Sequence, residues 1–177
     1  MAEITVRRLG VDDWAEFRSV RLTALQESPE AFVATHEEEA AAPEDFWRAR
    51  MERSVRLLAE SDGEVVGVVS IGAYAEEAHI AQLFGLWVAP ERRGSGVATA
   101  LVRAGAKVAA NAGNRQLYYW VGTDNARAVA FASGFGFRPT SSRRPMRVVS
   151  KVDGEEEIAM TLPLGEDRGS FGRTTRY

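Results

Sequence analysis

The way successive apolar segments are connected constrains the topology of this chain more than any other feature. Val55–Ala59 and Val65–Tyr74 flank Asp62-Gly63, and Asp-Gly between apolar runs is typical of a tight hairpin turn. Ile80–Val88 follows after another short turn, so these three segments are predicted to be antiparallel strands. The next connection is a helix at Ser95–Asn111. A helical crossover makes the strands on its two sides parallel, so the predicted sheet is mixed.

The remaining segments extend this sheet at both ends. A first strand is expected at Ile4–Arg8, and helices are expected to begin at Asp12 and Pro43. Between these helices, Thr35–Ala42 contains three consecutive glutamates and is predicted to be a solvated loop. The remaining expected elements are a strand at Leu117–Val121, a short helix at Asn125–Ser133, and closing strands at Phe137–Thr140 and Glu157–Leu162.

The expected fold class is therefore α/β of the α+β type. It has a mixed, mostly antiparallel sheet of about seven strands flanked by about four helices. Residues 1–164 are expected to form one domain, because no linker or internal repeat divides them. Residues 165–177 are rich in Gly, Ser, Thr and Arg and are predicted to be a disordered tail.

Composition excludes several classes of function. The chain has no cysteine, which rules out disulfides, a thiolate zinc site and an acyl-cysteine intermediate. Its two histidines, His36 and His79, argue against a histidine-rich metal centre, so no metal is expected. No stretch of about eighteen apolar residues occurs, so no membrane association is expected and the predicted location is the cytoplasm. A net charge of −3 argues against nucleic acid as a partner.

The net charge conceals a gradient along the sequence. Residues 91–150 contain ten basic residues and only two acidic ones, whereas residues 1–90 carry an excess of acidic residues. The basic block suits an anionic ligand and the acidic part a cationic one. Alternatively, the blocks interleave in the fold and the asymmetry averages out in space.

A strand, a glycine-containing turn and a helix start lie within Leu86–Thr99. A helix N-terminus leaves backbone N–H groups unpaired, and Gly94 and Gly96 remove side chains, so a phosphate can approach that backbone. A pyrophosphate site follows, although two glycines also occur at helix starts that bind nothing. The P-loop pattern fails because no Lys-Ser/Thr follows, and the dinucleotide fingerprint fails because its third glycine is missing.

Two segments resemble the signatures of the GNAT superfamily of acyl-CoA-dependent N-acetyltransferases. Arg93-Gly94-Ser95-Gly96-Val97-Ala98 matches the pattern Arg/Gln-x-x-Gly-x-Gly/Ala, and Asn125-Ala126-Arg127-Ala128 with Gly136-Phe137 is similar to the second signature. The resemblance covers roughly residues 3–163. It implies a sheet that splays apart between its fourth and fifth strands, with acetyl-CoA as acyl donor in the gap.

The resemblance also assigns cofactor contacts. Backbone groups of the fourth strand would pair with the pantetheine arm, the turn and helix start would hold the pyrophosphate, and an asparagine and a phenylalanine would contact the pantetheine and thioester. An arginine among Arg92, Arg127, Arg143, Arg144 and Arg147 would meet the 3′-phosphate. The cofactor-binding residues implied are Leu86, Trp87, Val88, Arg93, Gly94, Ser95, Gly96, Val97, Ala98, Thr99, Asn125 and Phe131.

Proton transfer is where the chain departs from the family pattern. Many members carry a tyrosine seven residues after the asparagine, and here that position is Ala132. Many also carry a glutamate on the fourth strand, where this chain has Gln82 and Phe84. The catalytic residues therefore stay open, and transfer by proximity with solvent taking the protons is an acceptable alternative. The replacement candidates are Gln82, Ser133, Tyr119 and His79.

The resemblance implies transfer of an acetyl group from acetyl-CoA to a primary amine, by direct attack in a ternary complex. A small-molecule amine is the expected acceptor, and acidic residues of the first two helices and their loop suggest a cationic one. A protein N-terminal or lysine acetyltransferase and a non-catalytic acyl-CoA-binding regulatory domain are the alternatives. The sequence leaves the acceptor, the acyl group and a homodimer open. The acidic residues are Glu27, Glu30, Glu37, Glu38, Glu39, Glu44 and Asp45.

Overall fold

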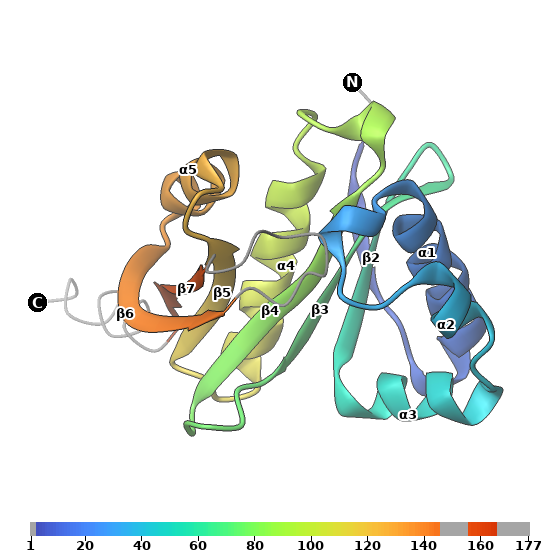
Figure 1. Cartoon of the computed structure of the whole chain (residues 1–177), viewed down its shortest axis with the longest axis horizontal. Coiled ribbons are helices and arrows are strands. Elements are labelled where there is room, and N and C mark those ends of the chain that lie inside the picture. Colours follow the sequence, from blue (N-terminus) through green and yellow to red (C-terminus); the bar gives the residue numbers. More distant parts are fainter. Residues whose placement is uncertain (1–2, 146–155, 166–177) are drawn as a thin grey trace, which may run out of the picture.

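A seven-stranded mixed sheet forms the centre of the molecule, as the connection pattern predicts (Figure 1). The computed structural model describes residues 3–145 and 156–165. The strand order is β1-β2-β3-β4-β5-β7-β6, and β4 and β5 form the parallel pair. The strands are β1 (Thr5–Arg8), β2 (Val55–Ser61), β3 (Glu64–Ala73), β4 (Ile80–Val88), β5 (Gln116–Gly122), β6 (Arg138–Pro145) and β7 (Glu156–Pro163).

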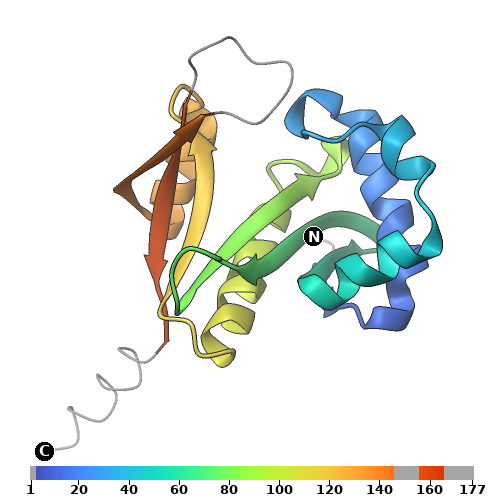
Figure 2. The same cartoon turned by 60° about the horizontal axis from the view of Figure 1, so that its bottom comes forward.

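Helices cover both faces of this sheet. Leu101 and Val102 pack in the core against the β2–β4 face, and Phe17 and Trp47 lie in a second core against the opposite face. Figure 2 shows the N-terminal helices gathered at one side of the sheet, away from β5 and β7. The helices are α1 (Trp14–Glu27), α2 (His36–Ala40), α3 (Glu44–Arg53), α4 (Val97–Asn111) and α5 (Ala126–Phe135), with 3-10 turns η1 (Val11–Asp13), η2 (Pro29–Ala31) and η3 (Pro90–Arg92).

The prediction of a solvated loop at Thr35–Ala42 is wrong. The segment contains the short helix α2, whose N-terminus is capped by the Thr35 hydroxyl accepting from the Glu38 amide at 3.2 Å. Glu39 is buried with 3% exposure. The chain therefore has five α-helices in the described residues, one more than expected, because a cap and a buried side chain stabilise this turn.

Two other boundaries differ from the predicted ones. Helix α4 begins at Val97 rather than Ser95, because Gly96 adopts a left-handed conformation with φ +95° and ends the turn before it. Strand β6 extends to Pro145 rather than Thr140, since Arg143 and Arg144 pair with β7 after a bulge.

The splay between β4 and β5 is confirmed, and a β-bulge accompanies it. The two strands pair only from Ile80–Gln116 to Leu83–Tyr119. Beyond the Phe84–Ser70 pair, the register of β4 against β3 shifts, and Gly85, directly after Phe84, has φ +62°. A bulge increases local twist and bends its strand, so β4 turns away from β5 here (Figure 2).

Residues 166–177 lie outside the described residues, so the disordered tail stays a prediction. In the described part of the chain, none of the helices combines the length and the apolar character needed to cross a bilayer. Within residues 3–145 and 156–165, acidic and histidine side chains form no cluster suited to a metal ion.

Candidate active site

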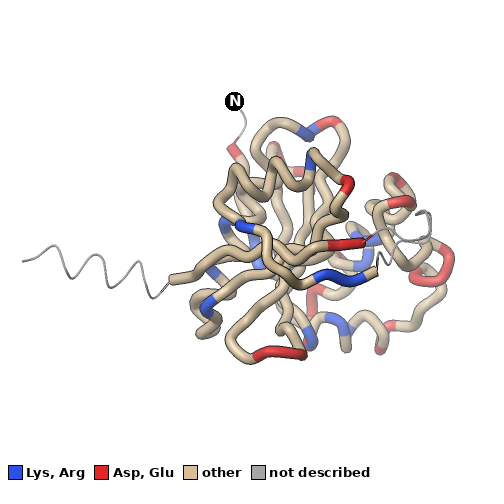
Figure 3. Tube along the Cα trace, turned by 60° about the vertical axis from the view of Figure 1, so that its left-hand side comes forward, with Lys and Arg blue, Asp and Glu red and all other residues tan. Residues whose placement is uncertain are grey.

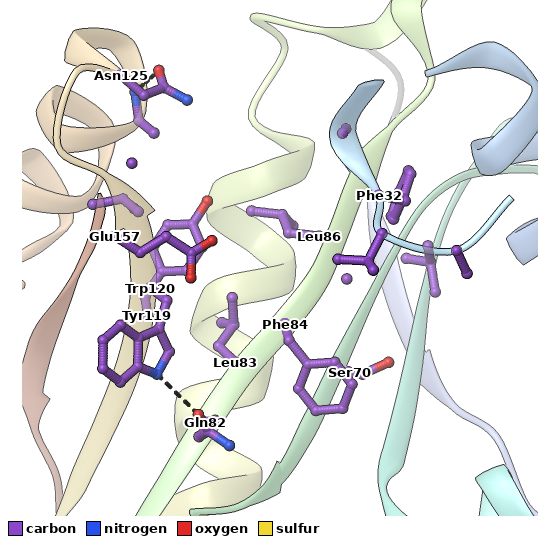
Figure 4. A pocket seen from close by; sticks show the side chains of 18 of the residues that line it. Phe32, Ser70, Gln82, Leu83, Phe84, Leu86, Tyr119, Trp120, Asn125 and Glu157 are labelled. Atoms are coloured by element: carbon purple, nitrogen blue, oxygen red, sulfur yellow. Dashed lines mark hydrogen bonds between the residues drawn. The ribbon is translucent and has the colours of Figure 1, made fainter. Parts of the chain in front are cut away.

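A large cleft opens where β4 and β5 diverge. Its volume is about 1260 Å³, and its walls come from parts of the chain that are distant in sequence. One wall is built by β5, the loop after it and β7. The other is built by β2, β3, α1, η2, α2 and α3. Strand β4 runs between them, with Leu83, Phe84, Gly85 and Leu86 lining the cleft (Figure 4).

The edge of β4 that faces β5 lacks a described strand partner beyond Leu83. An unpaired edge offers N–H and C=O groups to an extended ligand, in the manner of an added strand. Leu86 is half-buried and lines the cleft, whereas the Trp87 side chain is buried in the core beneath α1. The Val88 carbonyl already accepts a hydrogen bond from Arg93 Nε at 3.0 Å. Of these three predicted residues, only Leu86 presents both backbone and side chain to the gap.

The turn between β4 and α4 has the form of an anion-binding loop. Gly94 and Gly96 have φ values of +82° and +95°, which side-chain-bearing residues rarely adopt. A Cβ at Gly94 would meet nothing within 4 Å, so the surrounding space is open. Among the described residues, the amides of Gly94, Gly96, Val97, Ala98 and Thr99 have no backbone or side-chain acceptor. Free N–H groups at a helix start suit a pyrophosphate.

The arginines next to this loop are already engaged. Arg92 pairs with Asp62 at 3.6 Å and donates to the Ser61 hydroxyl at 3.2 Å. Arg93 pairs with Glu27 at 2.9 Å. Neighbouring carboxylates therefore already compensate these two guanidinium groups, which leaves less positive charge for a phosphate.

A second pocket lies between α4 and α5 and contains unpaired basic side chains. Its volume is about 780 Å³, and Thr99 and Phe131 line it rather than the main cleft. Arg103 and Lys107, expected from the helix pattern to point away from the core, line this pocket as exposed residues. Neither forms an ion pair with a described residue. The basic block of the sequence thus contributes charge here.

Charges elsewhere in the fold interleave, as Figure 3 shows for the face around β6 and β7. Arg144 pairs with Glu157 at 2.7 Å and stacks over the Trp120 ring at 4.0 Å. That contact removes Arg144 from the candidates for a 3′-phosphate. Arg127 and Arg143 are exposed, and Arg147 lies outside the described residues.

Asn125 begins helix α5, and its side chain serves two purposes. Its Oδ1 accepts from the Ala128 amide at 3.1 Å, capping the helix as the sequence predicts. The carboxamide NH₂ has no described acceptor, and the residue lines the main cleft across the gap from β4 (Figure 4).

The structure separates the four candidates for proton transfer. Gln82 and Tyr119 line the main cleft, where Trp120 Nε1 donates to Gln82 Oε1 at 2.9 Å. Ser133 is exposed on α5, and His79 is exposed in the turn before β4 with φ +65°; neither lines the cleft. These two residues are therefore not placed for catalysis.

Tyr119 faces the cleft from β5 (Figure 4). Its ring packs edge-on against Phe137 with centroids 6.0 Å apart, which holds it in place. Burial raises the pKa of the Tyr119 hydroxyl above its usual value of 10, so it keeps its proton at neutral pH. A protonated hydroxyl in the gap can donate to a leaving group.

Glu157 on β7 is a half-buried carboxylate of the cleft that the sequence analysis did not single out. Its side chain is 12% exposed, and Oε2 accepts from Arg144 Nε at 2.7 Å. It lines the cleft beside Trp120 and Tyr119 (Figure 4). Its position in an alternating strand gave no signal, because Glu155, Glu156 and Glu157 form a run of three acidic residues that looks like a solvated edge.

The opposite wall is basic, and this too was missed. Arg21, Arg50, Arg53 and Arg56 line it, from α1, α3 and β2. Arg56 is 4% exposed and lies in the apolar strand segment Val55–Ala59, which is the sequence signal that could have marked it.

One buried carboxylate holds part of this basic wall. Arg21 donates to Glu39 at 2.9 and 3.3 Å, and Arg50 donates to it at 3.0 and 3.1 Å. Burial opposes ionisation of Glu39, but these hydrogen bonds and charges prevail and lower the pKa of its carboxyl. Burial, together with the charges of Arg50, Arg53 and Arg21, lowers the pKa of Arg56 to about 9.

The predicted acidic mouth for a cationic amine is not formed as expected. Of its seven acidic residues, only Glu30 and Glu38 line the cleft. Glu27 and Glu44 pair with Arg93 and Arg48, and Glu39 is buried among arginines. Acidic residues that are close together in the sequence therefore do not make this wall of the cleft acidic.

Comparison with known proteins agrees with this geometry. A model of the Acetyltransferase (GNAT) family matches residues 19–137. The fold is similar to that of yncA, a putative acetyltransferase from Salmonella typhimurium solved with its cofactor acetyl-CoA: TM-score 0.70, 20% identity, covering 92% of this chain and 95% of that one. It is also similar to the ribosomal-protein-S18-alanine N-acetyltransferase from Escherichia coli, with TM-score 0.66, 21% identity and coverage of 93% and 98%.

An uncharacterized N-acetyltransferase from Methanocaldococcus jannaschii is 28% identical over 95 residues. The match covers 51% of this chain and 42% of that relative, so less than half of the relative's length is shared. The family model, in contrast, spans more than half of the present chain. With the splayed sheet and the glycine loop at the start of α4, this shows that the chain belongs to the acetyltransferase (GNAT) family.

Proposed function

We propose that this protein transfers an acetyl group from acetyl-CoA to the primary amine of a small molecule. The observation that carries the proposal is the open edge of β4, which runs from the anion-binding loop Arg93–Ala98 into a cleft lined by Tyr119, Gln82 and Glu157. Acetyl-CoA supplies an acetyl group activated as a thioester, which an amine can take directly. The absence of cysteine is consistent with direct transfer.

The residues present fit such a cofactor. The free amides of Gly94 and of Gly96 to Thr99 suit the pyrophosphate, and the open space at Gly94 admits it. The edge of β4 at Leu86 suits the amide groups of pantetheine, with Asn125 across the gap. Arg103 and Lys107, which line the second pocket beside Thr99 and Phe131, replace Arg92 and Arg144 as the proposed partners of the 3′-phosphate.

Proton transfer is proposed for two residues that face the cleft from β5 and β7. Glu157 keeps one carboxylate oxygen free of its described partner Arg144, so it can accept the proton of the incoming amine directly or through water. Tyr119 keeps its proton at neutral pH and can give it to the departing thiolate. Gln82, fixed by Trp120, orients the amine or a water.

Release of free CoA thiol from acetyl-CoA, with a panel of primary amines, amino acids and peptides, tests this function. We expect release with small amines and a thermal shift on addition of acetyl-CoA alone. Acetylated peptides with no small-molecule turnover would replace the small-molecule assignment by a protein acetyltransferase. A thermal shift without release from any acceptor would instead indicate a non-catalytic acyl-CoA-binding domain. The cytoplasmic location and a homodimer remain predictions.

A further inference from the structure

The inner part of the basic wall carries more positive charge than its buried partner compensates. Arg21, Arg50 and Arg56 meet there, and Glu39 is the carboxylate that pairs with the first two. Glu30 and Glu38 line the same side of the cleft as exposed residues, and neither hydrogen-bonds to these arginines in the described structure. An excess of buried guanidinium groups attracts an anion.

Arg56 is the most buried member and has no carboxylate partner among the described residues. Its Nη1 donates to the Ser70 hydroxyl at 2.6 Å and its Nη2 to the Arg50 carbonyl at 3.0 Å, while Nε is buried without a described partner. The guanidinium lies 4.7 Å from the centre of the Phe17 ring and 5.5 Å from that of Phe84. A charge enclosed in this way is stabilised when an anion binds nearby.

Hydrogen-bond donors next to Arg56 point to one place in the cleft. Arg21 uses Nε and Nη2 for Glu39, which leaves Nη1 free of a described acceptor. Ser70 accepts from Arg56 and has its own hydroxyl proton to donate. The Arg21 Nη1 and Ser70 Oγ atoms lie 4.0 and 3.8 Å from the position that a Cβ on Gly85 would take. Both atoms therefore lie near the bulge of β4.

Arg53 adds an exposed charge at the rim of this site. It lies at the C-terminal end of α3, is exposed, and forms no ion pair with a described residue. A guanidinium together with a hydroxyl donor matches the two oxygens of a carboxylate. Across the cleft, Glu157 and Gln82 present acceptor groups suited to an amine. One wall of the cleft thus suits a carboxylate, and the other suits an amine.

We propose that the acceptor is an amino acid or a similar amino carboxylate, whose carboxylate binds at Arg21, Ser70 and Arg53 while its amine faces Glu157 and Gln82. The inference rests on the proposed acetyl transfer and names its substrate class. It replaces the cationic amine expected from the sequence by a zwitterion, because Glu39 and Glu44 pair with arginines and, of the acidic residues in α2 and α3, Glu38 alone lines the cleft.

The test compares the proteinogenic amino acids with their C-terminal amides in the thiol-release assay. We expect kcat/KM to be about 10- to 100-fold higher for the preferred acid than for its amide, the value of one or two charge-assisted hydrogen bonds. Arg53→Gln should reduce this preference about 10-fold, mainly through KM. Equal or faster turnover of the amides would overturn the inference and leave the acetyl transfer standing.

Arg48→Gln is the matched control, because Arg48 lies on the same helix but pairs with Asp12 and Glu44 instead of lining the cleft. It should keep the preference for the acid. Arg21→Gln removes a proposed carboxylate partner from the inner part of the site and should also reduce the preference for the acid. Because Arg21 also hydrogen-bonds to Glu39, the melting temperature of this variant is measured in parallel. Arg53 is exposed, so its variant remains informative if the Arg21 variant unfolds.

A second readout does not depend on turnover. Malonate is titrated into the protein without acetyl-CoA and followed by calorimetry. We expect saturable binding that Arg53→Gln weakens and Arg48→Gln preserves. Should no amine release thiol at all, the acetyl transfer fails, and the malonate titration still decides the anion site. Malonate binding that is absent, or equal in both variants, would refute the site.

Discussion

Glu39 is the residue whose removal tests the description of the basic wall most directly. Its carboxylate is 4% exposed and accepts four hydrogen bonds from Arg21 and Arg50, at 2.9 to 3.3 Å. Glu39→Gln preserves the size and one acceptor oxygen but removes the charge. The two guanidiniums, 16% and 18% exposed, then face each other and Arg56 with no buried anion between them.

Removing one partner of a buried ion pair costs about 3–5 kcal/mol. Because water reaches part of both guanidiniums, the lower end applies, about 3 kcal/mol of the free energy of unfolding. For a chain of this size the melting temperature should fall by about 6–12 °C. Urea denaturation at neutral pH measures the effect, with the midpoint lowered and the slope unchanged.

The stability lost in Glu39→Gln should depend on pH in a specific way. The pKa of Glu39 is lowered in the folded protein, so its ionised form contributes stability above the usual pKa of 4.5. That contribution is lost as the pH falls through the folded pKa. The stability difference between wild type and Glu39→Gln should therefore shrink in acid. Glu37→Gln, an exposed neighbour on α2, is the control and should change stability by less than about 0.5 kcal/mol.

A loss below about 1 kcal/mol for Glu39→Gln would place this cluster among ordinary surface pairs and refute the description of a buried charge network. The same conclusion would follow from a stability difference that does not change between neutral and acidic pH. A double variant that also carries Arg21→Gln should lose less than the sum of the two single variants, because the first substitution has already broken the shared contact.

Three further predictions concern the cofactor loop, proton transfer and helix packing. Gly94→Ala forces a Cβ onto a backbone with φ +82°, which should lower the free energy of unfolding by about 1 kcal/mol. The same substitution should weaken acetyl-CoA binding in calorimetry. An unchanged affinity would argue against this loop as the anion site. Tyr119→Phe should lower kcat about 10- to 100-fold with little change in acetyl-CoA affinity, and an unchanged kcat would remove Tyr119 from proton transfer. Because burial raises the pKa of this hydroxyl, the wild-type enzyme should lose the contribution of Tyr119 to kcat only as the pH rises above the usual value of 10. Gly105→Ala places a Cβ 2.7 Å from Ile71 Cδ1 and should lower the free energy of unfolding, measured in urea, by about 1–3 kcal/mol. The matched change Gly134→Ala, whose Cβ meets nothing within 4 Å, should stabilise α5 by up to about 1 kcal/mol. Equal effects of the two substitutions would refute the close packing of α4 on the sheet.

Local features of the sequence predicted the glycine turn before α4 and the helix cap at Asn125, whereas the cofactor contacts assigned to them stay predictions. The free amides after Gly94 and the cap at Asn125 depend on residues close together in the chain, so spacing reveals them. Candidates for proton transfer were predicted less well from the sequence. Gln82 and Tyr119 line the cleft, whereas Ser133 and His79 do not. Side-chain direction at a turn or a helix end depends on φ and on packing, which spacing alone does not supply.

The succession of strands along the chain, the antiparallel turns, the parallel crossover and the glycine loop could be predicted from the sequence, because hydrogen-bonded turns and helix starts depend on neighbouring residues. The position of β7 between β5 and β6 was not predicted. The acceptor side of the cleft, in contrast, depends on contacts between elements that are distant in the sequence. Arg21, Glu39, Arg56 and Ser70 come from four different elements, and a glutamate in an acidic run looks the same whether water or guanidinium surrounds it. Packing of α1, α2 and α3 against the sheet removes that water, so burial, rather than composition, fixes the charge of this wall.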